Sequence, residues 1–217
     1  MKNNLKINIG CSISPTIGWE NFDNSPGMTL AKFKIVADIM YFLNIITKDQ
    51  YEIVSFYNKN KIKYANVSKK IPLNNDSVYV VYSSHMLEHL DRNEASLCIK
   101  EAHRVLHKNG IIRLVLPNIK QYVDEYLVHN DADKFIESTF MGTTVPKSLI
   151  KKIMNFISGP RHHLWMYDEQ SLSKLLINHG FNSPKILKAG ETMIENYGNL
   201  DLFEREGDSF YIEAYKN

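Results

Sequence analysis

The stretch DSVYVVYSSHMLEHL, residues 76–90, decides the predicted fold. Residues 77–82 are rich in β-branched and aromatic side chains and follow the turn residues Asn74-Asn75-Asp76, which is typical of a buried strand. The next residues, from His85 to His89, spell H-x-x-E-H, the spacing of an inverted zinc-protease site. The stretch therefore offers two interpretations, a zinc site or the end of a strand in an α/β sheet.

The zinc interpretation is the weaker one. A zinc site of this kind needs its motif inside a continuous helix, together with a distant third ligand. Here the motif follows directly on the strand, so His85 lies at or before the first helical turn and the required geometry is not secured. We therefore predict no metal site, and we expect Glu88 and His89 to be structural residues.

Strand and helix patterns alternate along the rest of the chain, which favours an α/β fold with a mostly parallel sheet. Strands are predicted at 5–9, 19–23, 62–67, 77–82, 111–116, 186–187 and 210–215. Helices are predicted at 29–46 and 47–57, capped by Thr29 and Thr47, at 91–107, closed by Asn109-Gly110, and at 168–180, capped by Asp168. The segment 118–158 has helical patterns in pieces. The last two strands can pair antiparallel through their long connection.

Composition excludes several classes of protein. The chain has 217 residues, 44% of them hydrophobic, which fits one globular domain over residues 1–217. The net charge of +2, with no dense basic block, gives no reason to expect nucleic acid as a partner. Cys11 and Cys98 are the two cysteines, and they predict a reduced, cytoplasmic protein without disulfides. The N-terminus has no signal-peptide pattern, and no apolar run is long enough to span a membrane.

The order of motifs resembles that of the class I S-adenosylmethionine (SAM)-dependent methyltransferases, in particular the small bacterial type with a methyltransferase domain 11-like sequence. The pieces that carry the resemblance are INIGCS, GWENFDNSP, NVSKKIPLNNDSVYVVYSSHMLEHL, EAHRVLHKNGIIRLVLPN and HHLWMYDEQSLSKLLINHGF. The resemblance implies a Rossmann-like α/β fold: a seven-stranded, mostly parallel sheet with an antiparallel last strand and helices on both faces. It also implies that SAM lies across the carboxyl ends of the first strands, at the topological switch point.

The resemblance assigns cofactor-binding roles by position. The small residues Gly10, Cys11 and Ser12 allow the backbone to approach the cofactor. Asp23, at the end of the second strand, is expected to accept the ribose hydroxyls. The remaining expected cofactor residues are Asn66, Ser83 and Ser84.

Three positions depart from the family pattern. Asn8 and Asn66 stand where acids are usual, and Ser12 stands where a second glycine is usual. An asparagine carbonyl can still accept from the adenine amino group. These changes put cofactor affinity in doubt, so a methyltransferase-like binding or scaffold protein without catalysis stays open as an alternative.

On the acceptor side, His85 is the first candidate for a general base and His163 the next, with His162 beside it, because histidine titrates near neutral pH. The expected reaction is O- or N-methylation of a small molecule or a glycan, with S-adenosylhomocysteine as the product. Helical insertions at about 28–58 and 118–160 can form a lid over the acceptor. The oligomeric state stays open, with a homodimer as one option.

Overall fold

The computed structural model describes residues 5–142 and 162–217, and these form one seven-stranded sheet in the order β3-β2-β1-β4-β5-β7-β6. The strands are β1 (Lys6–Ile9), β2 (Glu20–Asp23), β3 (Ile62–Tyr64), β4 (Val78–Ser84), β5 (Leu106–Pro117), β6 (Phe181–Leu187) and β7 (Ser209–Lys216). Strand β7 pairs antiparallel with β5 and β6, and the other neighbours are parallel. The predicted Rossmann-like fold class, a seven-stranded and mostly parallel sheet with an antiparallel last strand, is confirmed. The expectation of helices on both faces is not met within the described residues, because a loop connection covers the second face.

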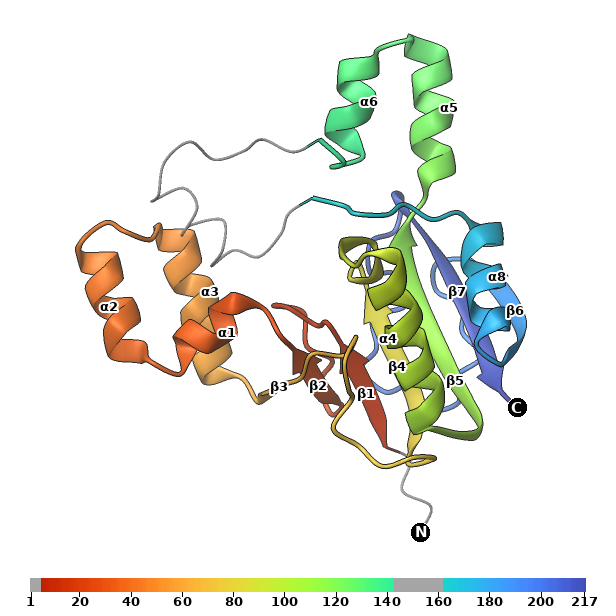
Figure 1. Ribbon diagram of the computed structural model, residues 1–217, viewed down its shortest axis with the longest axis horizontal. Helices are drawn as coiled ribbons and strands as arrows, with labels where there is room; N and C mark the ends of the chain where they lie inside the picture. Colours follow the sequence, from red (N-terminus) through yellow and green to blue (C-terminus); the bar gives the residue numbers. More distant parts are fainter. Residues whose placement is uncertain (1–4, 143–161) are drawn as a thin grey trace.

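Two helices pack on one face of the sheet. The helices are α1 (Pro26–Ala31), α2 (Lys34–Phe42), α3 (Lys48–Lys59), α4 (Arg92–Val105), α5 (Ile119–His129), α6 (Ala132–Ser138) and α8 (Glu169–Asn178), with a 3-10 turn η1 at Leu87–His89. Helices α4 and α8 lie on the same side of the sheet (Figure 1), and their buried residues join those of β1, β4, β5 and β7 in the main core. The opposite face packs against the connection between β6 and β7, through Ile194, Leu200 and Leu202.

Strand β4 lies at the centre of the sheet, as its sequence predicts. Five of its seven residues are buried, because β1 and β5 flank it and both faces are covered. The chain leaves β1 toward β2 on one side, and β4 lies on the other side. The carboxyl ends of β1 and β4 therefore border the switch point at which open α/β sheets bind their ligands.

The predicted helix at 29–46 is wrong in its extent. The chain forms α1 and α2 instead, and it leaves the helical conformation at Phe33, with φ −116° and ψ 61°. This turn lets Ala31 of α1 and Ala37 of α2 join one small core with Val54 of α3, which a single straight helix does not allow. Thr47 does cap α3, through a capping box with Gln50.

The predicted end of the helix at Asn109-Gly110 is also wrong. Helix α4 ends at Val105 and β5 begins at Leu106, so the Asn-Gly pair lies inside a strand. The register of β5 against β4 shifts between Val78 and Val80, which marks a bulge. A Cβ atom added at Gly110 would lie 2.9 Å from the His107 carbonyl oxygen and 3.1 Å from the Tyr79 carbonyl oxygen. Glycine therefore permits the close approach of the backbone at this point of the two strands.

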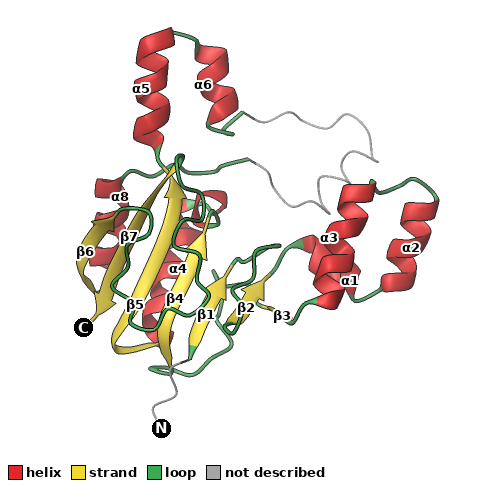
Figure 2. Cartoon of the chain, turned by 180° about the vertical axis from the view of Figure 1, so that it is seen from behind, coloured by secondary structure: helices red, strands yellow, loops and turns green. Residues whose placement is uncertain are grey.

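The remaining helices lie outside the main layers. Helices α1 to α3 extend beyond the β3 edge, and α5 and α6 project past the carboxyl end of β5 (Figures 1 and 2). The part of the predicted 118–160 insertion beyond residue 142 lies outside the described residues. Within the described ranges, every helix is too short or too polar to cross a membrane.

Candidate active site

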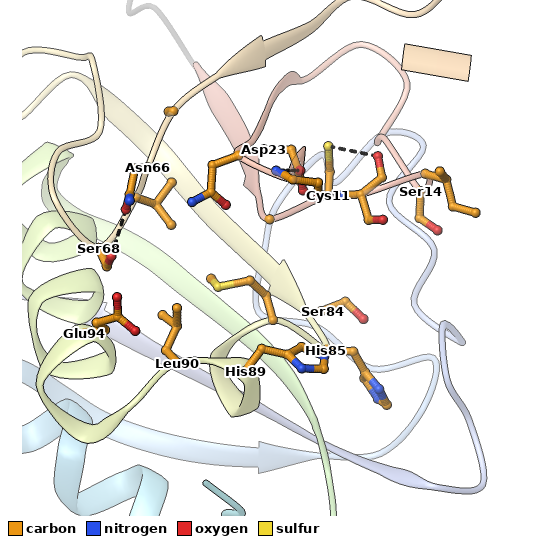
Figure 3. A pocket seen from close by; sticks show the side chains of 18 of the residues that line it. Cys11, Ser14, Asp23, Asn66, Ser68, Ser84, His85, His89, Leu90 and Glu94 are labelled. Atoms are coloured by element: carbon orange, nitrogen blue, oxygen red, sulfur yellow. Dashed lines mark hydrogen bonds between the residues drawn. The ribbon is translucent and has the colours of Figure 1, made fainter. Parts of the chain in front are cut away.

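A cavity of about 690 Å³ opens at the carboxyl ends of β1, β2 and β4. Its walls come from the loops after β1, β2, β3 and β4, and Phe140, His163, Glu204 and Arg205 close one end. Figure 3 shows Asp23, Asn66 and His85 around this cavity, each from a separate element. The volume lies within the range of about 300–1,000 Å³ that is usual for small-molecule and cofactor sites.

The loop after β1 is held tightly against β2. The backbone amides of Gly10 and Cys11 both donate to the Phe22 carbonyl oxygen, at 2.8 and 3.2 Å. Gly10 has φ +68°, and a side chain there would lie 2.2 Å from Cγ of Met86. Ser12 also adopts a positive φ of 45°, which an L-residue tolerates at a cost of about 1–2 kcal/mol. The loop therefore has the shape of a glycine loop even where serine replaces glycine.

Asp23 fixes this loop from the end of β2. Its Oδ2 accepts from the Ser12 backbone amide at 2.8 Å, and its Oδ1 accepts from the Ser25 amide at 2.6 Å. The residue is buried, yet it lines the cavity. Each carboxylate oxygen keeps a further lone pair, so Asp23 can hold the loop and still accept hydroxyl groups of a ligand.

Asn8 supports the same loop from beneath. Its side-chain amide donates to the Ser14 carbonyl oxygen at 3.2 Å and to Thr16 Oγ1 at 3.1 Å. A carboxylate has no such donors when ionised. Asn8, which stands where the family usually has an acid, therefore holds the loop by donating hydrogen bonds to it.

The other expected cofactor residues divide into two groups. Cys11, Asn66 and Ser84 line the cavity. Burial, with the Asp23 charge, raises the pKa of the Cys11 thiol, which keeps it neutral. The expected role of Ser83 is not supported, because its buried hydroxyl donates to the Ile9 carbonyl oxygen at 2.9 Å and it does not line the cavity. Side chains alternate between the two faces of a strand, so Ser84 lines the cavity while its neighbour Ser83 does not.

His85 follows β4 directly and has φ 47°. Its Nε2 lies 2.6 Å from Ser209 Oγ, which in turn donates to Asp208 at 2.8 Å. Nε2 therefore carries the hydrogen, and Nδ1, which lies 3.6 Å from Glu88 Oε1, keeps its lone pair. Burial, with Arg205 nearby, lowers the pKa of His85 to about 4, so the ring is neutral at pH 7.

Glu88 and His89 lie in η1, below the loop, and they meet a segment far along the chain. The Glu88 carbonyl oxygen accepts from the amides of Leu164 and Trp165, at 2.8 and 3.1 Å. This pairing brings His163 to the cavity beside them, with its Nε2 4.0 Å from Glu88 Oε1. The H-x-x-E-H motif is thus split between a strand end and a 3-10 turn.

The electrostatics of this cluster are governed by burial. Burial raises the pKa of Glu88 to about 8, although its own backbone amide opposes this. Burial, with His89 nearby, lowers the pKa of His163 to about 4.

The sequence did not assign several residues of the site: Glu88, His89, Met86, Glu204 and Arg205. No motif marks Glu204 and Arg205, which reach the cavity from the connection between β6 and β7.

The comparisons with known proteins agree with this geometry. A family model described as a methyltransferase domain matches residues 43–114. No curated protein matches the sequence. A SAM-dependent methyltransferase from Thermotoga maritima superposes with a TM-score of 0.54 at 14% identity, covering 98% of this chain and 82% of the other. One from Methanosarcina mazei superposes with a TM-score of 0.53 at 15% identity, covering 100% of this chain and 93% of the other.

At these identities the solved structures establish the fold, and the methyltransferase-domain match covers 72 of the 217 residues. The matched residues 43–114 run from the end of α2 into β5, and so contain β4 and the His85 loop. The cavity lies at the switch point, where open α/β folds bind their ligands. The chain therefore has the fold of the SAM-dependent methyltransferases, and its residues 43–114 match a methyltransferase domain.

Proposed function

We propose that this enzyme transfers the methyl group of SAM to a hydroxyl or amine of a small molecule or a sugar. One observation carries the proposal: the loop Gly10–Ser12 and the side chain of His85 line the same cavity. Donor and acceptor can then meet in one enclosed space, and placing them in line supplies much of the rate.

The cofactor half of the cavity, defined as Gly10–Ser12, Asp23, Asn66 and Ser84, is proposed to hold the donor. When bound, SAM supplies an electrophilic methyl group on a sulfonium. Asp23 accepts the ribose hydroxyls with its remaining lone pairs. Asn66 accepts from the adenine amino group through its side-chain oxygen, which also accepts from Ser68 Oγ at 2.8 Å. The small loop residues allow the backbone to approach the methionine part.

The acceptor half, defined as the lining residues His85, His89, Phe140 and His163 with Glu88 buried behind them, is proposed to position the nucleophile. His85 is the general base, because Nδ1 has a free lone pair while Ser209 and Asp208 hold Nε2–H. As the acceptor oxygen or nitrogen forms its bond to the methyl carbon, the carbon–sulfur bond breaks, and Nδ1 takes the acceptor proton. Asp208 then stabilises the imidazolium through Ser209. His163 faces the same end of the cavity and is proposed to orient the acceptor.

The helical insertion after β5 is proposed to form a lid. Phe140, which follows α6, is the part of this insertion within the described residues that lines the cavity. It contacts His163, with ring centroids 5.5 Å apart. Helices α1 to α3 are a second wall in this proposal. A cytoplasmic location fits the free cysteines Cys11 and Cys98.

A methyltransferase-like binding protein without catalysis remains the second candidate, and the position of Met86 favours it. Its side chain packs against Gly10, where the family brings the cofactor close to the backbone. Methionine is flexible enough to move aside. The test is methyl transfer from labelled SAM into the small molecules and glycans of a cellular extract. Labelled product supports the enzyme, whereas binding of S-adenosylhomocysteine without turnover by any extract supports the second candidate.

A further inference from the structure

Three side chains with metal-binding atoms meet at the acceptor half of the cavity. One ligand atom each from Glu88, His89 and His163 lies within 4.8 Å of the other two. His89 and His163 line the cavity, whereas Glu88 is fully buried behind them. Two of these residues come from η1 and the third from the segment after residue 161, so the tertiary fold creates the cluster.

Both histidines are oriented by partners on the nitrogen that faces away. His89 Nδ1 lies 3.0 Å from the His162 carbonyl oxygen, to which it can only donate. His163 Nδ1 lies 3.2 Å from the Met166 sulfur, a weak acceptor. In His89 the hydrogen is therefore on Nδ1, and Nε2 carries a lone pair. His163 also makes a hydrogen bond with the Thr139 backbone, so one of its two ring nitrogens donates and the other carries the lone pair. Metal-binding histidines are held in the same manner, with the second nitrogen donating to a carbonyl or carboxylate.

Glu88 adds a carboxylate whose acceptor capacity is not used. Within residues 5–142 and 162–217, neither of its oxygens makes a well-formed hydrogen bond. The residue is 0% exposed, so water does not solvate it either. An unpaired carboxyl in such a place costs stability, and buried charges in proteins are usually paired or coordinate metals. Its Oε1 points toward the histidines, 4.0 Å from His163 Nε2.

We propose that Glu88, His89 and His163 bind a divalent first-row transition metal of the Zn²⁺ type. Two imidazoles and one carboxylate form a common ligand set for catalytic zinc, which leaves a further position open. At metal–ligand bonds of about 2.0–2.1 Å, tetrahedral ligand atoms lie about 3.4 Å apart. The present spacing of up to 4.8 Å therefore has to shorten by about 1.4 Å on binding, through rotation of the side chains.

The open coordination position faces the cavity, since both histidines line it. An ion there can take the acceptor oxygen as its fourth ligand and make that group easier to deprotonate. His85 Nδ1, 3.6 Å from Glu88 Oε1, lies close enough to receive the proton. This catalytic role rests on the proposed methyl transfer, whereas binding of the ion does not.

The test is a calorimetric titration of Zn²⁺ into metal-free protein that carries no histidine tag. We expect one Zn²⁺ per chain, and a tetrahedral absorption spectrum when Co²⁺ replaces it. Glu88→Gln and His163→Asn should each weaken Zn²⁺ binding by more than about 100-fold, because loss of an outer-shell partner alone costs about 10–100-fold. His107→Asn is the matched control, since His107 lies near the amino end of β5, away from the cavity.

The outcomes separate this proposal from the proposed function. Loss of Zn²⁺ binding in Glu88→Gln and His163→Asn, with retention in His107→Asn, supports the site. Equal Zn²⁺ binding in all four proteins, or none in the parent chain, overturns it. S-adenosylhomocysteine is titrated separately into the same proteins, so failure of the metal site leaves the cofactor result intact. A thermal unfolding curve for each variant, recorded without metal, identifies any variant that has lost its fold.

Discussion

Two buried carboxylates, one in each half of the cavity, differ in how their oxygens are used. Asp23 in the cofactor half is 4% exposed, and both of its oxygens accept backbone amides. Glu88 in the acceptor half is 0% exposed, and its oxygens make no well-formed hydrogen bond within the described ranges. Asp23 therefore stabilises the folded state, whereas Glu88 destabilises it as long as no ligand binds to its carboxylate.

This contrast separates the parts of a site that a fold builds from those that a ligand completes. The loop around Asp23 holds its shape without a ligand, because Gly10, Ser12 and Ser25 are fixed by backbone bonds. The cluster around Glu88 has ligand atoms as far as 4.8 Å apart and an unused carboxylate. We therefore expect loss of the carboxylate to lower the stability of the fold at Asp23 and to raise it at Glu88.

The largest expected effect is on turnover, from His85→Asn. Asparagine tolerates the positive φ at this position but cannot act as a base. Loss of a general base should lower the methyl-transfer rate by about 10²–10⁴-fold. The rate is measured as transfer of labelled methyl groups from SAM to acceptors in a cellular extract, with His107→Asn as the control. A variant with the full rate, or one that also loses S-adenosylhomocysteine binding, would show that His85 is not the base.

The next effect is on cofactor affinity, from Asp23→Asn. The NH2 that replaces one carboxylate oxygen cannot accept a ribose hydroxyl or a backbone amide, and the remaining oxygen loses its charge. Losing charge-assisted hydrogen bonds of about 1.5–3 kcal/mol each should weaken S-adenosylhomocysteine binding by about 100-fold. Calorimetry measures this, and Asp49→Asn on the exposed start of α3 is the matched control. Unchanged affinity in Asp23→Asn would remove Asp23 from the cofactor half.

A gain in the stability of the fold is expected for Glu88→Met in metal-free protein. Methionine has a similar length and needs no hydrogen bond, so the cost of an unsatisfied buried carboxyl disappears. The free energy of unfolding should rise by about 2 kcal/mol. Urea unfolding of the parent chain and the variant, both treated with chelator, measures it. A clear loss of stability would mean that Glu88 is paired in the native fold and that the two halves do not differ.

The smallest effect is expected for Ser12→Gly. Glycine removes a left-handed penalty of about 1–2 kcal/mol, but it also gives the unfolded chain more freedom, worth up to about 1 kcal/mol. A net gain of about 0.5 kcal/mol in the free energy of unfolding is expected. Denaturant unfolding compares it with the parent chain. A loss of stability would mean that the Ser12 side chain supports the loop in its own right.

The fold could be predicted from the sequence because its signals are local. Residues 77–82 form a continuous apolar strand, and Thr47 and Asp168 both cap the helices expected of them. The errors arose where tertiary contacts decide. The break at Phe33 depends on packing against α3, and Asn109-Gly110 lies inside β5 because this strand pairs with β4 on either side of it, at Leu106 and at Ile111. Neither contact is visible in the neighbouring sequence.

The sequence pointed to residues in both halves of the cavity, since Gly10 and Asp23 in the cofactor half and His85 and His163 in the acceptor half all line it, but it did not show how the acceptor half is assembled. Gly10 and Asp23 lie at strand ends, where the sheet topology itself brings them together. The acceptor half joins His85 and Glu88 to His163, Ser209 and Arg205, which lie more than 70 residues further along the chain. The sequence alone therefore made Glu88 and His89 structural residues, because their partner His163 is supplied by a distant segment that pairs with the Glu88 backbone.

Calorimetric titration of S-adenosylhomocysteine into the parent chain tests the central claim most directly. The cavity at the carboxyl ends of β1, β2 and β4 should bind one molecule per chain, and Asp23→Asn should weaken that binding while Asp49→Asn leaves it unchanged. Absence of binding at about 1 mM ligand, which corresponds to less than about 4 kcal/mol of affinity, would contradict the assignment of this cavity to the cofactor.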